Sequence, residues 1–412
     1  MIISILPSHP AFRVALLIVL IISGFKLQAQ SGCTDPSATN YNPSALSNDG
    51  SCLYTVTHYD MIFRAKFGTG IDESSGVVYT DGKLWTHNDS GSPSDIFAID
   101  TSTGAFVQTV HVDNYPNVDW EDISADSSYI YISDCGNNNG TRKDLKVLKI
   151  AKADIGTAAV VHVNAQAINL SYTDQTSFVS SNSHNFDCEA LIAVKDSLYL
   201  FTKDRGDYRT RVYKMPKTPG TYALSPYTSF YAGGLITGAD YNPGTKEVVL
   251  IGYLSGHTNS FLWFLNDFKV DSFFSGNKRR IEIGIGQEWQ TEGVCYFPNG
   301  RFLISNELTN SIPASFYVGY RSFQNPSAVG NQATIAFKGL YPNPVRNTLF
   351  IPWTQQDAGY TICNTNGQVI RRGILHNGNN SLDLSSVLPG DYFITAQDAE
   401  HREYRDVFVK GQ

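Results

Sequence analysis

Short runs of alternating apolar and polar residues fill the middle of this chain, and turn residues join them. The run Ser128-Tyr-Ile-Tyr-Ile-Ser has the two-residue period of a β-strand, and Asp81-Gly82 is typical of a tight turn. A larger unit also recurs: an acidic residue, an apolar run, a turn, a second apolar run, then Asn or Asp. Copies run from Glu73 to Asn88, Glu121 to Asp134, Glu189 to Asp204 and Glu292 to Asn306, and a fifth, from Thr237 to Tyr253, lacks the leading acid.

The spacing of the copies predicts a β-propeller. They begin about 50 to 70 residues apart, which is close to the length of one blade. Further strand-like runs follow each copy, as at 95–100 and 105–110, so each unit has four strands. The segment 56–67 is expected to complete the last blade, and a degenerate sixth blade has room between Glu121 and Glu189. We therefore predict an all-β chain: a five- or six-bladed β-propeller at 55–325, followed by a small C-terminal immunoglobulin-like β-sandwich.

Composition and charge indicate an exported protein that does not bind nucleic acid. The 412 residues carry a net charge of −7, and no long basic cluster is present. Nine apolar residues at 14–22, flanked by Arg13 and Lys26, predict a signal peptide over 1–29. The alternative is a lipoprotein signal in which Cys33 carries the lipid. No later segment is apolar enough to span a membrane, so we expect no transmembrane span in the mature chain.

Residues 30–54 predict a small module closed by a disulfide between Cys33 and Cys52, because the segment has too few apolar residues for a core. Its Asp and Asn oxygens suit either a bound cation or ordinary turns. A second bridge, between Cys135 and Cys188, is left open. The segment resembles the GCTDPxAxNYNP module of exported Bacteroidota proteins.

The C-terminal region starts after a linker at 326–338 and covers 339–412. Its strand-length runs and turns predict the β-sandwich. With its Tyr-Pro-Asn-Pro sequence, its later Leu-x-x-Gly-x-Tyr pattern and its terminal lysine, it resembles the type IX secretion C-terminal sorting domain. The resemblance implies recognition by the type IX secretion machinery, passage across the outer membrane, and then release or attachment to the cell surface. The motif residues are Tyr341, Pro342, Asn343, Pro344, Gly390, Tyr392 and Lys410.

The repeated acids are the candidate metal ligands. Carboxylates that converge on a propeller axis repel one another, so they need solvent, protonation, basic neighbours or a cation. We expect a wide and wet channel, in which solvent alone is one sufficient answer. A calcium site is another, and its ligands would be a subset of Glu73, Asn88, Glu121, Asp122, Asp134, Glu189, Asp204, Glu292 and Asn306. His87 is the candidate base for any hydrolysis.

Three short matches add a second resemblance. Residues 119–123, 133–138 and 187–191 resemble bacterial propellers near the esterase-like phytase and gluconolactonase-type groups. This implies a metal-supporting central pocket. The function we expect is binding of a small-molecule or glycan ligand at the acid-lined axial face, with calcium assisting. The alternative is a calcium-dependent hydrolase of an ester, lactone or phosphoester, and the sequence leaves open whether the protein is an enzyme.

Overall fold

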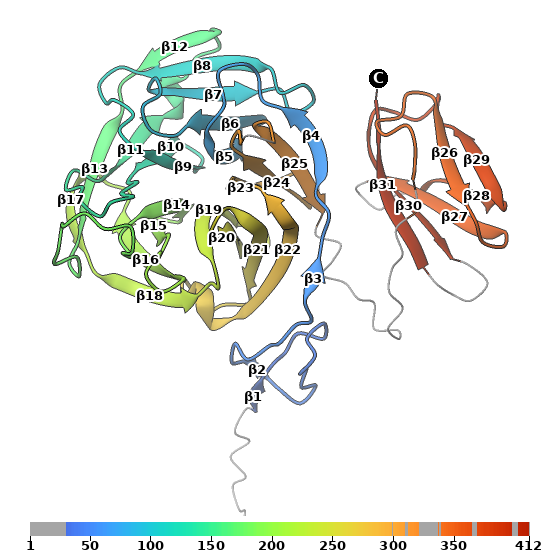
Figure 1. Ribbon diagram of the computed structural model, residues 1–412, viewed down its shortest axis with the longest axis horizontal. Coiled ribbons are helices and arrows are strands. Elements are labelled where there is room, and N and C mark those ends of the chain that lie inside the picture. The colour runs from blue at the N-terminus through green and yellow to red at the C-terminus, as the bar shows by residue number, and fades with distance from the viewer. Residues whose placement is uncertain are drawn as a thin grey trace, which may run out of the picture.

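A computed structural model describes residues 30–298, 300–309, 312–320, 337, 339–364, 369–397 and 403–411. The predicted signal peptide and nearly all of the predicted linker lie outside these residues. In Figure 1, five sheets surround a central axis, with a small module at the N-terminal end and a β-sandwich at the C-terminal end. The described residues contain two single-turn 3₁₀ helices, η1 (Lys152–Asp154) and η2 (Phe273–Ser275), and no α-helix.

The five sheets are the blades of a propeller. Blade 1 has β5 (Ser74–Thr80), β6 (Lys83–Asn88), β7 (Asp95–Ile99) and β8 (Phe106–Val112), and blade 2 has β9 (Trp120–Ala125), β10 (Tyr129–Asp134), β11 (Lys146–Ala151) and β13 (Gln166–Tyr172). Blade 3 has β14 (Cys188–Val194), β15 (Ser197–Thr202), β16 (Arg209–Pro216) and β18 (Pro226–Tyr231). Blade 4 has β19 (Leu235–Asn242), β20 (Glu247–Leu254), β21 (Thr258–Asn266) and β22 (Asn277–Glu288). Blade 5 has β23 (Thr291–Phe297), β24 (Arg301–Asn306), β25 (Ser315–Tyr320) and β4 (Ile62–Lys66).

The ring closes as the sequence predicts, because β4 from the start of the chain pairs antiparallel with β25. The sixth blade for which the sequence leaves room is not formed by residues 121–189. They supply blade 2 and one extra strand, β12 (Val160–Val163), which pairs in parallel with β8 at the outer edge of blade 1. Blade 2 gains β17 (Gly220–Leu224) and blade 4 gains β3 (Thr57–His58) at their outer edges.

Both faces of the inner strands are apolar because each blade packs between two others. Along β10, Ile130 and Ile132 pack toward blade 1, whereas Tyr131 between them packs toward blade 3. The same arrangement gives one hydrophobic cluster at each of the five blade boundaries, and all of these side chains are buried. A strand that is buried on both faces needs no polar face, which is why its polar residues are concentrated at the strand ends.

The axis is closed rather than wide and wet. At Gly76 a Cβ atom would lie 2.7 Å from the Cα of Asp122, and at Gly238 it would lie 2.3 Å from the carbonyl oxygen of Glu292. Glycine therefore lets the inner strands of different blades approach to backbone contact. The acids above this contact layer are buried: the exposed fractions of Glu121, Glu189 and Glu292 are 4%, 2% and 3%. The expectation that solvent floods the channel is wrong, since a ring of five blades leaves too little space.

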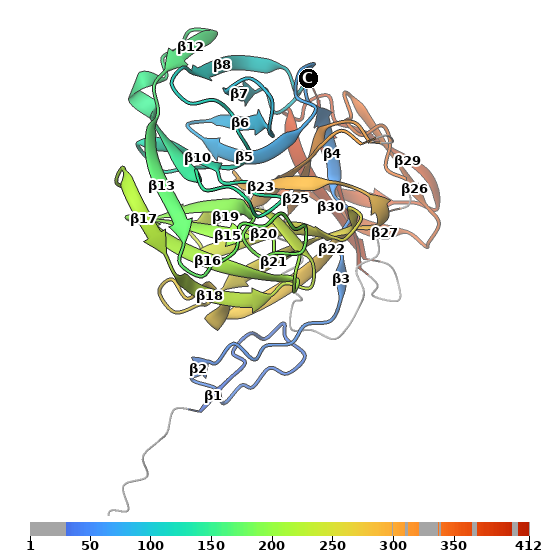
Figure 2. The same ribbon diagram turned by 60° about the vertical axis from the view of Figure 1, so that its left-hand side comes forward.

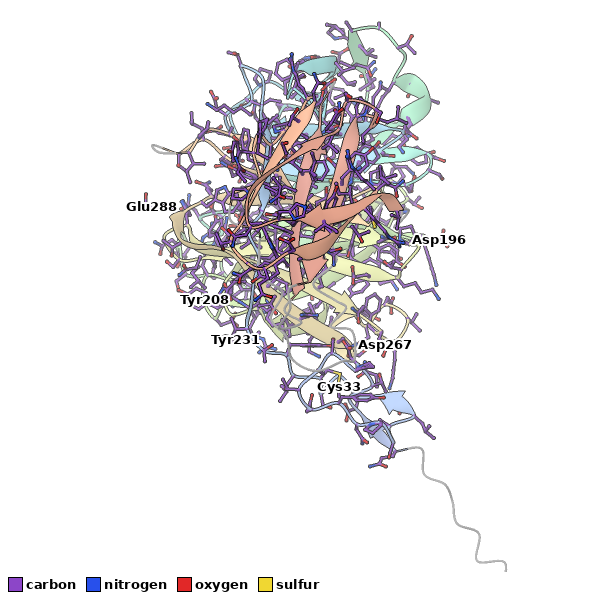
Figure 3. The ribbon with its side chains drawn as sticks, turned by 90° about the vertical axis from the view of Figure 1, so that its right-hand side faces the viewer. Cys33, Asp196, Tyr208, Tyr231, Asp267 and Glu288 are labelled. Atoms are coloured by element: carbon purple, nitrogen blue, oxygen red, sulfur yellow. A yellow bond between two sulfur atoms is a disulfide. The ribbon has the colours of Figure 1, made fainter. Side chains whose placement is uncertain are left out.

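The N-terminal module has two short strands, β1 (Ser31–Gly32) and β2 (Ser47–Asn48), and the Sγ atoms of Cys33 and Cys52 are 2.07 Å apart. Asp267 of blade 4 joins it to the propeller by accepting hydrogen bonds from Thr34 and Asn48; Cys33 and Asp267 are labelled at this junction in Figure 3. The thiols of Cys135 and Cys188 are both buried and in mutual contact, but no disulfide joins them.

The C-terminal sandwich has its own core around Trp353, Ile362 and Phe408. One sheet pairs β26 (Thr348–Trp353) with β29 (Gly378–Asp383), and the other runs in the order β28 (Val369–Leu375), β27 (Ala358–Asn364), β30 (Gly390–Gln397), β31 (Glu403–Lys410). The motif residues tie its start to its last strand: the side chain of Asn343 accepts a hydrogen bond from the Val409 amide at 2.8 Å. Tyr392 stacks on Phe408, and its hydroxyl donates to the Leu388 carbonyl.

Candidate functional site

A β-bulge recurs at the start of the innermost hairpin of every blade. In each case the register shifts by one residue, so the inner strand has one more residue than the second strand at this point. A bulge turns the extra side chain away from the regular alternation of the sheet. The residues at this position are Ser75, Glu121, Glu189, Thr237 and Glu292, and they form a ring at the axis. Blades 1 and 4 thus contribute hydroxyl groups, and the other three contribute carboxylates.

The bulge corrects the assignment of Glu73. The sequence repeat aligns Glu73 with the other leading acids, but Ser75 occupies the structurally equivalent position. Glu73 is exposed, two residues before the ring. Ser75 instead joins blade 1 to the ring, because its hydroxyl donates to the Glu121 carbonyl oxygen at 2.8 Å.

Carboxylates from the loops extend this ring into a cluster. Oxygens of Asp89, Asp119 and Glu121 lie within 4.8 Å of one another, and so do oxygens of Glu121, Asp187 and Glu189. Glu121 is common to both trios and stands at the centre of the cluster. Asn117 brings the loops of Asp89 and Asp119 together, since its side chain donates to the Asp89 carbonyl oxygen and accepts from the Trp120 amide.

The basic side chains are placed on one side of the cluster. Lys203 Nζ lies 3.0 Å from Glu189, and Arg205 pairs with Asp187. Asp187 also accepts a hydrogen bond from the Asn137 amide at 2.6 Å. On the other side, Arg142 approaches Asp119 only to 3.9 Å, and it also pairs with Asp134 at 3.0 Å. The second trio is therefore largely neutralised, whereas the trio of Asp89, Asp119 and Glu121 is not.

Glu121 has the least compensated charge of the cluster. Burial and the neighbouring carboxylates, Glu189 foremost, raise its pKa well above the ordinary value. Two unit charges at most 4.8 Å apart repel with an energy on the order of 3 kcal/mol at an effective dielectric constant of about 20. Among the described residues, no hydrogen-bond donor reaches Glu121 Oε1. A buried carboxylate in this setting is held by a proton or by a cation.

The pKa values of other acids at the axial face are also shifted. Burial, with the charges of Asp89 and Asp187, raises the pKa of Asp119 to about 7. Burial, with the charge of Glu292, raises the pKa of Glu307 to about 10. The pKa of Asp187 lies below its usual value, because Arg205 and Lys203 outweigh the opposing effect of burial. These carboxyl groups lie with Glu121 at the axial face, and a group of perturbed acids in one place is a candidate for a functional site.

The Asn or Asp that ends each of these four repeats makes contacts within its own blade. Asn88 accepts a hydrogen bond from the Glu73 amide, and Asp134 accepts one from the Asp119 amide, both at 3.2 Å. These contacts close the innermost hairpin and fix the loop that leads to the bulge. Asp204 pairs with Arg211, and Asn306 donates to the Pro313 carbonyl oxygen. Neither Asp134 nor Asp204 belongs to either carboxylate trio.

Asp122 and His87 also lie away from the cluster. Asp122 is fully buried in the contact layer and accepts hydrogen bonds from the backbone amides of Ile123, Leu191 and Ala239. His87 is fully buried, its ring meets Trp120 edge-on, and burial lowers its pKa to about 4. The structure therefore places the proposed base where it is neutral and out of reach of solvent.

The sequence repeat missed the acids that complete the cluster. Asp89, Asp119, Asp187 and Glu307 each lie one or two residues from a repeat position, in the loops that enter or leave the inner hairpin. For Asp119 and Asp187 the available signal was the motif resemblance, since the matches at 119–123 and 187–191 begin on them; for Asp89 and Glu307 it was their closeness to the repeat. Gly136 lies directly against these acids: a Cβ atom there would lie 2.1 Å from Glu121 Oε1 and 2.5 Å from the Asp119 carboxyl carbon. The backbone at Gly136 thus forms one wall of the site.

Comparison with known families identifies the C-terminal domain. Residues 339–410 match the sequence model of the Secretion system C-terminal sorting domain. The C-terminal region is therefore a type IX sorting domain, and the protein is exported across the outer membrane to the cell surface or the medium. Among the described residues, no helix is long and apolar enough to cross a membrane.

Solved structures similar to this chain include several propeller-like proteins. The PQQ-bound aldose sugar dehydrogenase of Streptomyces coelicolor has 10% identity and a TM-score of 0.39 over 62% of this chain and 96% of that chain. A GH43_1 enzyme from Xanthomonas citri has 12% identity and a TM-score of 0.39 over 63% and 90%. PorZ, a surface component of the type IX secretion system of Porphyromonas gingivalis, has 12% identity and a TM-score of 0.30 over 84% and 46%. We draw no functional argument from similarities this low.

One curated protein matches a short stretch of sequence. Ribulose bisphosphate carboxylase/oxygenase activase 1 of Larrea tridentata is 74% identical over 23 residues, which are 6% of this chain and 5% of that protein. A match of this length says nothing about the activity of the propeller.

Proposed function

We propose that this exported propeller binds one calcium ion through Asp89, Asp119 and Glu121 at its axial face. The bound ion, together with Arg205, would then hold a small-molecule or glycan ligand. The observation that carries the proposal is the environment of Glu121: a buried carboxylate, shared by two carboxylate trios, whose Oε1 has no donor among the described residues.

The dimensions of the trio fit calcium. Calcium binds carboxylate and carbonyl oxygens at about 2.3–2.6 Å, so two oxygens on the same ion are at most about 5 Å apart. The oxygens of the trio satisfy this limit. A ligand set made only of oxygens favours a hard cation over zinc or copper. The ion would offset the charge that Arg142, at 3.9 Å from Asp119 and already paired with Asp134, leaves uncompensated.

The ligand would meet groups of both signs. Asp89 and Asp119 are half-buried, so the trio opens toward solvent on one side. Arg205 lies beside it, and the Arg205 guanidinium also donates to the Asn138 side chain at 2.7 Å. A calcium ion with a free coordination position, beside a guanidinium and amide groups, suits a ligand with adjacent hydroxyl or carboxylate groups, as glycans have.

Binding is better supported than hydrolysis. A calcium-dependent hydrolase needs a base beside the metal-bound water, but His87, the candidate base, is fully buried against Trp120. The acids within reach of the ion would serve as its ligands. No observation on the described residues favours hydrolysis over binding.

Calorimetric titration of calcium into the chelator-treated full chain at pH 7, with a parallel melt, tests the proposal. We expect one saturable site and a higher melting temperature with calcium. Glu121→Gln should abolish both, because it keeps the shape of the side chain and removes the charge. Gly136→Ala should also abolish binding, since its methyl group would press on Glu121 and Asp119.

The matched control is Glu73→Gln, which neutralises an exposed acid near the same face but outside the trio. It should leave the calcium affinity unchanged. Absence of heat and of a melting shift in the folded wild-type protein would overturn the proposal, as would equal affinity in Glu121→Gln. If calcium binds, a glycan array probed in calcium and in chelator tests the ligand class, and Arg205→Ala should weaken the calcium-dependent signal.

A further inference from the structure

A second group of metal-ligating side chains lies far from the axis, at the outer edge of blade 1. It forms where β12 leaves blade 2 and pairs in parallel with β8, as Figures 1 and 2 both show. The pairing register sets His162 directly opposite His111. Asp113 follows β8 by one residue, so two imidazoles and a carboxylate from two separate segments meet at this edge.

The three side chains are close enough to share one ion. His162 Nδ1 lies 2.7 Å from Asp113 Oδ1, and His111 Nε2 lies 3.9 Å from the same oxygen. All three ligand atoms are within 4.8 Å of one another. In a tetrahedral zinc site with bonds of about 2.0–2.1 Å, ligand atoms are about 3.3 Å apart. The observed separations bracket this value, so small side-chain rotations would complete the geometry.

Asp95 orients the imidazole ring of His111. Its carboxylate is hydrogen-bonded to His111 Nδ1 at 2.5 Å, which makes Nδ1 the protonated nitrogen and leaves Nε2, the nitrogen facing Asp113, as an acceptor. Asp95 and His111 are direct partners in the register of β7 and β8. A carboxylate that fixes the tautomer of a ligating histidine is the usual support of a zinc ligand. Asp95 is not one of the three ligands, so it adds a contact beyond them.

We propose that His111, Asp113 and His162 form a zinc site on the rim of blade 1, with Asp95 positioning His111. Two imidazoles and one carboxylate match the ligand preference of zinc, whereas calcium prefers oxygen alone. The side chains of His111, Asp113 and His162 are 38%, 45% and 63% exposed, so water or a partner molecule has access to the fourth position.

The ion would fasten β12, which lies in the chain between two segments of blade 2, to the edge of blade 1. β12 has only four residues and lies at the edge of its sheet, between two segments that belong to blade 2. A zinc ion bound by both His111 and His162 would join β12 and its flanking loops to β8. Zinc should therefore stabilise the protein and protect the segment 152–165 from proteolysis.

Zinc titration of the chelator-treated full chain in the Glu121→Gln background tests the site, because that substitution removes the proposed calcium centre. We expect one zinc equivalent and, with cobalt(II) in its place, the visible absorption of a tetrahedral site. His162→Ala should weaken zinc binding at least tenfold. Asp95→Asn should weaken it by about tenfold, as other orienting carboxylates do.

His376→Ala is the matched control, because His376 also pairs with an exposed aspartate, Asp357, at 2.8 Å, but among the described residues it belongs to no group of three metal-ligating side chains. It should leave zinc affinity unchanged. Circular dichroism confirms that each variant is folded. The proposal is overturned if the folded parent protein binds no zinc, or if the His111→Ala/His162→Ala double variant binds it as tightly as the parent does. Neither result bears on the axial calcium centre, whose ligands differ.

Discussion

Glu121 and Asp122 are neighbours in the sequence and both are buried, yet they lie in two different layers of the propeller axis. Asp122 lies in the contact layer, where three backbone amides from blades 2, 3 and 4 donate to its carboxylate. Glu121 lies above it, among other carboxylates, with one oxygen that no donor reaches among the described residues. Burial raises the pKa of both.

The two acids share burial and differ in their hydrogen-bond donors: backbone amides satisfy the carboxylate of Asp122, whereas one oxygen of Glu121 has no donor among the described residues. Asp240 repeats the structural case, since its carboxylate accepts the Tyr241 and Tyr296 amides and so joins blade 4 to blade 5. Asp122 and Asp240 hold the blades together, whereas the cluster around Glu121 has unused acceptors and unbalanced charge.

The strongest test of this comparison is Asp122→Ala. The substitution leaves three buried amides without their acceptor, each costing roughly 1–3 kcal/mol. We expect the free energy of unfolding to fall by about 4 kcal/mol, measured by urea denaturation, with calcium affinity retained in the folded fraction. A loss under about 1 kcal/mol would contradict the structural role of Asp122.

Lys203→Met should have the next largest effect. Lys203 is buried and pairs with Glu189 at 3.0 Å, and breaking a buried pair on one side costs roughly 3 kcal/mol or more. We expect a loss of about this size in chelator and a smaller loss in calcium, because the ion supplies positive charge to the same cluster. Denaturation curves with and without calcium measure it. Equal losses of stability in the two conditions would show that Lys203 does not interact with the calcium site.

The pH dependence of stability gives a third test. The pKa of Asp119 is raised to about 7, and that of Glu121 is raised well above its ordinary value of 4.5. In chelator these groups keep their protons in the folded protein at a pH where the unfolded chain has released them. The free energy of unfolding should therefore fall as pH rises from about 5 to about 7, by up to about 1.4 kcal/mol per pH unit for each group.

Two changes should flatten this slope: the substitution Glu121→Gln, which removes a titrating group, and excess calcium, which replaces the proton. Urea denaturation at several pH values in chelator provides the comparison. An identical slope in the wild-type protein and in Glu121→Gln would show that Glu121 ionises normally.

The smallest effect is expected for Glu73→Gln. Glu73 is exposed, and Ser75 rather than Glu73 has the ring position in blade 1. We expect a stability change within about 0.5 kcal/mol, measured by the same denaturation, because surface substitutions away from special contacts have little effect. A large change would mean that Glu73, rather than the bulge residue, belongs to the site.

The fold was largely predictable from the sequence. The alternating runs predict the four-stranded units, and the segment at 56–67 supplies the closing strand β4 as expected. The C-terminal motifs identify the sorting domain. Of the site, the repeat found Glu121, Glu189 and Glu292 in the ring. It also aligned Glu73 with them, whereas Ser75 has the bulge position, and it included Asn88 and Asp134, whose side chains close the hairpins. It could not place Asp89, Asp119 and Asp187, because loop conformations bring them together.

The sequence by itself determined the strands, the turns and the export route, because these depend on local periodicity and on short motifs. Only the tertiary structure decided which side chains face the axis, because the strand register places the bulge at Ser75 and leaves Glu73 two residues before it, a difference that the hydrophobic pattern does not show. It also decided that His111 and His162 meet, since they come from segments that the sequence assigns to different blades. Charges from distant segments become a site only when the blades close and solvent is excluded around them.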